Sequence, residues 1–278
     1  MMFKNPFFSI VFVIGQETEI VHHSLLSILN QKYKNFEAIV INNSGVKFSQ
    51  KNIIKSLKNK KIRFFQFKKK KEVFYARNFG ISKSKSKYIS ILDSDDFFSE
   101  NHLKQAHKIF LKDKTDFYYT SFKNLNLKTN RFKSRKCPQK LKLFDLLTYC
   151  PIGHSTVIYK KKLINNYFPV KYRHDFATWS KLLPLNNVRI SMNPSFNVIR
   201  TIHEKNFTKN KMKLISYYLL IYRKYFKLNY AEIFYYFTFL IIRHLFANLS
   251  LSKIIEKPIL KKRYYSLHSY LNTLVSSK

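Results

Sequence analysis

The chain has 278 residues, of which 45% are hydrophobic, and this suits one large domain or one domain with a helical appendage. Its 52 lysines and arginines against 15 acidic residues give a formal net charge of +37. The two cysteines, Cys137 and Cys150, supply neither a disulfide framework nor a metal-binding spacing, so we expect a reducing compartment.

The first half of the chain alternates strand-like and helix-like patterns. Short apolar runs predict buried strands, and apolar residues at helical spacing predict helices. In chain order the expected strands are 8–14, 36–41, 62–67, 88–93 and 116–120, and the expected helices are 20–30, 53–57, 75–82 and 100–112. This alternation predicts an α/β fold, with a mostly parallel sheet and helices on both of its faces.

The second half is less regular and then changes character. Residues 122–150 are polar and basic, as expected of a hairpin and loops beside a site. Strands are expected at 155–159 and 196–202, with a helix at 176–183 between them. Beyond residue 210 the alternation stops. We therefore expect a catalytic-type domain over 1–209 and a helical region over 210–278.

Two long helices, at 214–226 and 233–249, dominate this C-terminal region and are rich in Tyr, Phe, Leu and Ile. Their longest uncharged stretch, 233–242, is far shorter than the ~20 apolar residues that a membrane-spanning helix needs. Aromatic faces with basic flanks suit helices that lie in the headgroup region of a bilayer. The alternative is that these faces pack on the catalytic domain or on a second copy of the chain.

The positive charge is spread over the whole length, and no nucleic-acid-binding motif accompanies it. The accompanying wealth of Asn, Ile, Phe and Tyr is typical of A/T-rich codon usage. The lysine run 68–71 is most simply a solvated loop. We therefore expect attraction to anionic lipid headgroups and phosphate-bearing substrates, with no specific nucleic-acid partner.

Three carboxylates, Asp93, Asp95 and Asp96, crowd the end of the strand at 88–93. In open α/β sheets, ligands bind beyond the carboxyl ends of the strands. Carboxylates there are hard oxygen ligands, suited to Mg²⁺ or Mn²⁺ carrying a diphosphate. The alternative is a turn whose aspartates cap the following helix.

Several segments in order resemble the motifs of family 2 glycosyltransferases, which have the GT-A fold. The resemblance covers roughly the first 210 residues. The segments are 9–12 with 27–37, A-R-N-F-G-I at 76–81, the strand and D-S-D at 88–96, P-I-G-H-S-T at 151–156, H-D-F-A-T-W at 174–179, and R-T-I-H-E-K-N at 200–206. Each is weak alone, and together they form a specific signal.

The resemblance implies transfer of a sugar from a nucleotide-diphosphate donor to an acceptor hydroxyl, with inversion and with Mn²⁺ or Mg²⁺ as cofactor. It places Asp95 as metal ligand, Asp93 at the metal or the donor ribose, and Asp96 in support. His203 could reach the diphosphate or the metal. Asp175 matches the position of the catalytic base, and its alternative role is to cap the helix at 176–183.

For other positions, the resemblance implies a role beside which a structural alternative stays open. Arg77 matches a fixed charge near the donor phosphates or uridine, or is an ordinary surface arginine of its helix. His154, His174 and Trp179 fall on the acceptor side. Trp179 could stack on an acceptor sugar or simply pack its helix against the core.

The nucleotide pocket departs from the family pattern. Val13-Ile14-Gly15-Gln16 stands where the family has P-T-Y-N, and Asn42-Asn43 stands where it has D-D. An Asn carbonyl can still accept a hydrogen bond from uracil, more weakly than a carboxylate. We therefore retain Gln16, Asn42 and Asn43 as donor-binding candidates, with the identity of the donor open.

The function that follows is an inverting, metal-dependent glycosyltransferase of the hexosyltransferase type, with a UDP-sugar as the expected donor. The acceptor would be a hydroxyl of a growing bacterial cell-surface glycan: lipopolysaccharide, lipooligosaccharide or capsule. We expect a cytoplasmic protein, peripheral at the cytoplasmic face of the inner membrane, with homo-oligomers an open alternative. The competing hypothesis is a catalytically impaired GT-A-like protein that binds glycan or assembles with other transferases.

Overall fold

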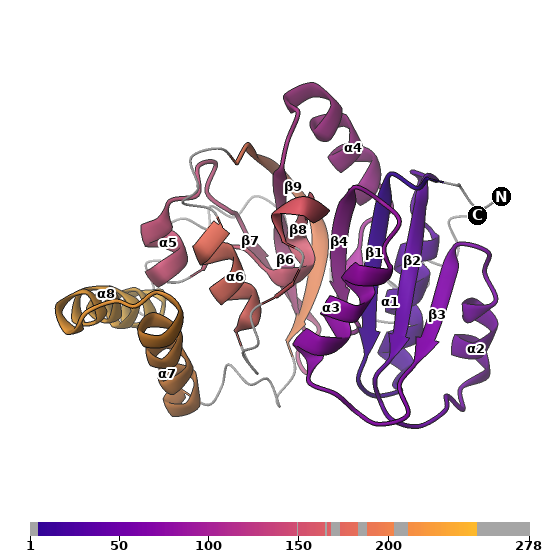
Figure 1. The fold of residues 1–278 in the computed structure, drawn as a ribbon, viewed down its shortest axis with the longest axis horizontal. Helices are drawn as coiled ribbons and strands as arrows, with labels where there is room; N and C mark the ends of the chain where they lie inside the picture. Colours follow the sequence, from indigo (N-terminus) through magenta and orange to yellow (C-terminus); the bar gives the residue numbers. More distant parts are fainter. Residues whose placement is uncertain are drawn as a thin grey trace.

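The computed structural model describes residues 5–148, 150–164, 166–167, 173–182, 188–202 and 211–248. A nine-stranded sheet has the order β3-β2-β1-β4-β8-β6-β9-β5, with β7 paired to β6 outside this path (Figure 1). The strands are β1 (Phe8–Ile14), β2 (Phe36–Asn42), β3 (Ile62–Gln66), β4 (Tyr88–Asp93), β5 (Phe97–Phe98), β6 (Phe117–Asn126), β7 (Arg131–Arg135), β8 (Val157–Lys160) and β9 (Ile190–Ile202). The predicted α/β fold is confirmed.

The first four strands form a parallel half-sheet that is covered on both faces. Every residue of β1 and β2 is buried, which explains their continuous apolar sequences. Parallel crossovers are right-handed, so α1 and α2 lie on one face and α3 lies on the other (Figure 1). These helices are α1 (Glu19–Leu29), α2 (Lys51–Leu57) and α3 (Val73–Lys83), and α4 (His102–Asp113) follows β5.

Helix α3 approaches the sheet unusually closely, and Gly80 permits this. A Cβ added at Gly80 would lie 2.4 Å from Cγ1 of Val11 and 2.9 Å from Cδ1 of Ile41. The glycine of the A-R-N-F-G-I motif is therefore required by packing. The buried face of α3 also carries Arg77 to the end of β4.

In the second half, β8 runs antiparallel to both β4 and β6, and β9 runs parallel to β6. β6 continues to Asn126 and pairs with β7, so the hairpin expected within 122–150 is present. The short helix α5 (Leu143–Thr148) was not predicted. β9 begins at Ile190, six residues before the predicted start at residue 196. The prediction missed these residues because a bulge, in which Thr120 pairs with Asn193 and Ser121 with Phe196, interrupts the regular pattern of the strand.

The C-terminal helices pack on the sheet domain through one face. They are α7 (Lys211–Leu220), a π-helical turn (Ile221–Tyr225) and α8 (Tyr230–Asn248), and they lie beside α5 and α6 (His174–Leu182) (Figure 1). A second apolar cluster joins the five segments; it contains Leu147, Phe176, Ala177, Tyr218, Ile221, Tyr222 and Ile233. This face of the C-terminal helices therefore packs on the sheet domain. Within the described residues, every helix is too short or too polar to cross a membrane.

A buried histidine makes the stability of this fold sensitive to pH. His102 is fully buried and stacks on Phe98 with ring centroids 4.2 Å apart. Neither ring nitrogen has a hydrogen-bond partner in the described part of the chain. Burial lowers the pKa of His102 to about 3. Between the ordinary pKa of 6.5 and this value, the unfolded chain binds a proton that the folded chain excludes, so stability falls as pH falls.

We predict that His102→Phe removes this penalty. Relative to the native chain, the variant should gain about 2 kcal/mol of unfolding free energy between pH 8 and pH 5. Thermal unfolding of both proteins across this range measures the gain. Parallel melting curves at all pH values would contradict the prediction.

Candidate active site at the carboxyl edge of the sheet

The strand ends that carry the predicted site residues meet at one edge. Ile14 pairs with Asn42, and Val13 pairs with Asp93, so β1, β2 and β4 end side by side. The strand order reverses between β1 and β4, which makes this edge the switch point where open α/β sheets bind ligands. A Cβ added at Gly15 would meet no atom within 4 Å in the described structure. The position thus opens onto space, and Gln16 beside it is exposed.

The acidic turn is held by its last carboxylate. The Asp96 backbone N–H donates to the carbonyl of Asp93 at 3.0 Å, closing the turn between β4 and β5. The Ser155 hydroxyl donates to Oδ2 of Asp96 at 2.6 Å and accepts from the backbone N–H of Asp93 at 3.1 Å. The Thr201 N–H donates to Oδ1 of Asp96 at 3.0 Å. Asp96 is therefore an anchor, and Asp93 and Asp95 occupy the partly exposed part of the turn.

Burial and the neighbouring carboxylates of Asp95 and Asp93 raise the pKa of Asp96 well above its ordinary value. Asp93 behaves oppositely: burial alone would raise its pKa, but Arg77 and His154 hold it well below the usual range. The turn therefore keeps Asp93 ionised, as a metal or ribose ligand requires.

Asp93 is the hub of a buried polar network. The guanidinium of Arg77 donates from Nη2 to Oδ1 of Asp93 and from Nη1 to Nε2 of His174. Nδ1 of His154 lies 3.2 Å from the same Oδ1, and Nε2 of His154 lies 3.1 Å from the hydroxyl of Tyr167. The network joins α3, β4, the 3₁₀ turn at His154–Thr156 and α6.

Both imidazoles of the network are neutral. Burial and the charge of Arg77 lower the pKa of His174 to about 3 and also lower that of His154. The hydrogen bonds then assign the protons: His154 donates from Nδ1 to Asp93 and accepts at Nε2 from Tyr167, and His174 accepts at Nε2 from Arg77. The Nδ1 of His174 has no partner among the described residues.

The expectation for Arg77 is therefore corrected. It is not a surface arginine, because it is only 8% exposed and its fork is occupied by Asp93 and His174. Its contact with the donor stays a prediction. His154 and His174, expected on the acceptor side, are likewise bound within this network. Trp179 is fully buried against Phe117 and Tyr159, which favours the packing alternative over stacking on a sugar.

Asp175 lies in the first turn of α6, next in the chain to His174, which binds Arg77. Because the helix starts at His174, Asp175 is not the residue that caps it. Burial would raise its pKa, yet chiefly the charge of Arg173, together with the backbone N–H of Phe176, lowers the pKa of Asp175 to about 2. The carboxylate is ionised, which is the form a general base requires.

Asn42 and Asn43 both bind backbone groups of nearby loops, and their expected contact with uracil stays a prediction. Asn42 binds the Ser44 N–H at 3.0 Å and the Val46 carbonyl at 2.7 Å. The amide of Asn43 accepts from the Lys71 N–H at 2.9 Å and donates to the Lys71 carbonyl at 3.0 Å. These bonds hold the exposed lysine run 68–71 beside the end of β2.

Sequence reasoning missed the roles of Ser155 and Arg200. Arg200 of β9 places Nε 3.8 Å from Oδ2 of Asp96, and its side chain is 38% exposed. A Cβ added at Gly153 would lie 2.8 Å from Cδ of Arg200, so the glycine makes room for this side chain. Ser155 and Arg200 lie within the motifs at 151–156 and 200–206, but their pairing with Asp96 is a contact between distant segments and has no local signal in the sequence.

His203 lies outside the described residues. In the described ranges, His, Cys, Asp and Glu nowhere form a cluster of three or more with the geometry of a metal site. A divalent ion of the expected kind is commonly bound by one or two carboxylates together with substrate phosphates. The described partners of Asp93 contact Oδ1, which leaves Oδ2 for such an ion. Asp93 and Asp95 are therefore suitable ligands for a divalent metal ion.

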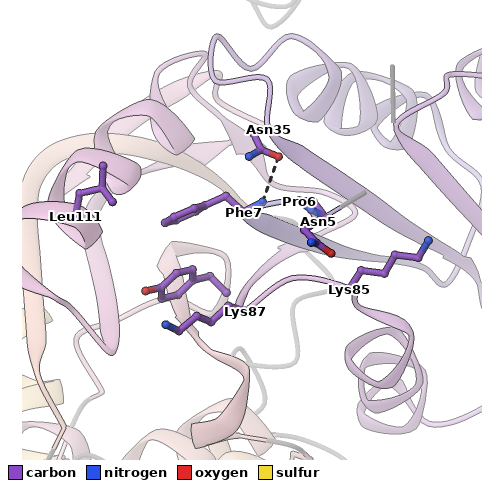
Figure 2. Close-up of a pocket in the computed structure, with 8 residues that line it drawn as sticks. Asn5, Pro6, Phe7, Asn35, Lys85, Lys87 and Leu111 are labelled. Carbon is purple, nitrogen blue, oxygen red and sulfur yellow. Dashed lines mark hydrogen bonds between the residues drawn. The ribbon is translucent and has the colours of Figure 1, made fainter. Parts of the chain in front are cut away.

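A separate pocket of about 470 Å³ lies at the opposite edge, beside the amino ends of β1 and β4. Figure 2 shows Phe7, Asn35, Lys85, Lys87 and Leu111 around it, with the Phe7 N–H donating to Oδ1 of Asn35 at 3.3 Å. It is unrelated to the carboxylates at the carboxyl edge.

The fold, with an acidic turn at its switch point, defines an α/β protein that binds its ligand at the carboxyl edge of the sheet, and comparison with known proteins identifies the family. The profile of Glycosyl transferase family 2 matches residues 9–173. The chain belongs to this family, whose members are glycosyltransferase enzymes.

Two relatives and one solved structure illustrate the likeness. An uncharacterized glycosyltransferase of Rickettsia bellii is 32% identical over 174 residues, which cover 59% of this chain and 24% of that protein. The Escherichia coli protein WfgD, named as a UDP-Glc:alpha-D-GlcNAc-diphosphoundecaprenol beta-1,3-glucosyltransferase, is 27% identical over 194 residues, 68% of this chain and 75% of that one. Staphylococcus aureus TarS 1–349 with UDP-GlcNAc superposes with a TM-score of 0.62, at 17% identity, over 91% of this chain and 76% of that one. This confirms the GT-A fold.

We predict that Asn43→Ala releases the lysine loop 68–71. Loss of both bonds to Lys71 should increase local opening, and hence tryptic cleavage within the loop, by about tenfold. Limited proteolysis with mass spectrometry measures the rate. Asn59→Ala, which removes a similar amide bond from the turn at Lys61, is the matched control. Equal cleavage of the two variants would show that the clamp is not needed.

Proposed function

We propose that the protein is an inverting, metal-dependent glycosyltransferase that moves a sugar from a UDP-sugar to a hydroxyl of a lipid-linked cell-surface glycan. The observation that supports this most is the Asp93 network. One buried chain of hydrogen bonds connects the ionised Asp93 at the switch point with the α6 segment that carries the ionised Asp175.

The chemistry divides between these two sides. Asp175 is the base that takes the proton from the acceptor hydroxyl as that oxygen attacks the anomeric carbon from the face opposite the diphosphate. Asp93 and Asp95, with His203 as a further candidate, would hold Mn²⁺ or Mg²⁺, and the ion when bound would neutralise the charge of the leaving diphosphate. The partly exposed guanidinium of Arg200 supplies a fixed positive charge beside the same turn.

The name of a relative supports the proposed acceptor, and the exposed surface of α8 supports the proposed location. The name of the E. coli relative WfgD specifies an acceptor on a lipid diphosphate. The outward face of α8 exposes Tyr230, Phe234 and Tyr235, next to the exposed basic side chains of Arg223, Lys224 and Lys227. Aromatic side chains with a basic rim suit the anionic headgroup region. We place the protein at the cytoplasmic face of the membrane that carries its acceptor.

The donor site is tested by thermal unfolding with UDP, GDP and CDP, with and without Mn²⁺. A ligand that binds the native state raises its stability by an amount set by concentration over dissociation constant. We expect a UDP-induced shift that requires Mn²⁺ and is lost in Asp95→Asn. Asp175→Asn should keep this shift while sugar transfer falls by about 10²-fold to 10⁴-fold.

Each other outcome is informative. A shift with GDP or CDP in place of UDP would overturn the assigned donor. Absence of any nucleotide shift would favour the impaired, glycan-binding alternative. Loss of nucleotide binding in Asp175→Asn would remove that residue from the role of base.

The membrane surface is tested by co-sedimentation with vesicles of phosphatidylglycerol or phosphatidylcholine. Burying one phenylalanine contributes about 2 kcal/mol, so Phe234→Ala should weaken binding to anionic vesicles by about tenfold or more. Leu111→Ala on α4 removes an equally exposed apolar side chain away from this face and should leave binding unchanged. Equal effects of both variants would rule out α8 as the docking face.

A further inference from the structure

The C-terminal helices contact the segment that carries the candidate base. Tyr218 of α7 is only 5% exposed, and its hydroxyl accepts a hydrogen bond from Nη2 of Arg173 at 2.7 Å. The guanidinium of Arg173 also lies over the Tyr218 ring, 5.2 Å from its centroid. The Phe176 ring meets the Tyr218 ring edge-on at 5.0 Å. Tyr218 therefore touches the residues on both sides of His174 and Asp175.

The backbone at this point is constrained as well. Arg173 has a φ of 60°, in the left-handed region that a non-glycine residue adopts only when its surroundings hold it there. Its carbonyl accepts the first helical hydrogen bond of α6, from the Ala177 N–H at 3.0 Å. The Arg173 guanidinium also lies over the Phe176 ring, 5.4 Å from its centroid. Side-chain contacts with α7 thus hold the start of α6.

We propose that Tyr218 is a positioning residue for the reaction: through Arg173 and Phe176 it fixes the start of α6 and so holds Asp175 in place. The inference rests on the proposed role of Asp175 as base. Its consequence is that the region after residue 210, which lies outside the match to the family profile, is part of the catalytic machinery.

The matched pair of variants is Tyr218→Phe and Tyr222→Phe. Both remove one buried hydroxyl from the same helical segment, but the Tyr222 hydroxyl donates to the carbonyl of Leu147 in α5, whereas the Tyr218 hydroxyl accepts from Arg173. We expect Tyr218→Phe to lower kcat by about tenfold with the donor KM unchanged. Tyr222→Phe should keep kcat while losing a similar amount of thermal stability.

The pH profile supplies a readout that loss of stability does not move. The charged or titratable groups around Asp175 are Arg173, His174, His154, Tyr167, Cys150 and Tyr218. When Arg173 is no longer held by Tyr218, the pKa of Asp175 rises. The acidic limb of kcat/KM should therefore move to higher pH in Tyr218→Phe and stay in place in Tyr222→Phe.

Hydrogen exchange separates this inference from the proposed function. The backbone amides of residues 174–177 should exchange faster in Tyr218→Phe than in Tyr222→Phe, whether or not the chain transfers sugar. Equal exchange and equal kcat in the two variants would overturn the inference. Faster exchange in a chain that neither binds nucleotide nor transfers sugar would keep the structural coupling, and it would overturn the positioning role together with the proposed function.

Discussion

The ion pair between Arg77 and Asp93 is the contact on which the site depends. A buried guanidinium is tolerated only when it is paired and hydrogen-bonded, and here Asp93 and His174 satisfy its fork. The pair exists because Gly80 lets α3 lie directly on β1 and β2, which brings Arg77 to the end of β4. One glycine, one arginine and one aspartate thus connect the packing of a helix to the charge state of the site.

The parts of this arrangement that could be predicted are those written along the chain. The buried strands are visible in the sequence as apolar runs, and the acidic turn directly follows the strand at the switch point. The edge of the sheet that holds the site could therefore be predicted. The bulge opposite Thr120 and Ser121 hid the start of β9, since its local sequence carries no regular alternation. Contacts between distant segments could not be predicted, because the pairings of Ser155 with Asp96 and of Arg200 with Gly153 have no signal in the local sequence.

The C-terminal helices show why two hypotheses from one amphipathic pattern need not compete. Ile233 of α8 is buried in the cluster with α5 and α6, whereas Phe234, one residue further on, is 75% exposed. Tyr, Phe and Ile therefore occur on both faces of the same helix. A pattern read from sequence cannot separate the faces when both are apolar, and the basic residues beside Tyr230 mark the outward one.

The contacts of Asn42 and Asn43 explain why amides stand where the family pattern has carboxylates. The side-chain amides of Asn42 and Asn43 hydrogen-bond to the backbone of the loops that follow β2 and β3. Neutral side chains and lysines therefore form this part of the carboxyl edge of the sheet. A carboxylate at position 43 could not donate to the Lys71 carbonyl, and the clamp would lose half of its bonds. The amide at position 43 therefore fixes a basic loop beside the end of β2. In the function proposed above, this loop can attract the phosphates of the donor, and Gly15 opens onto free space at the same edge of the sheet.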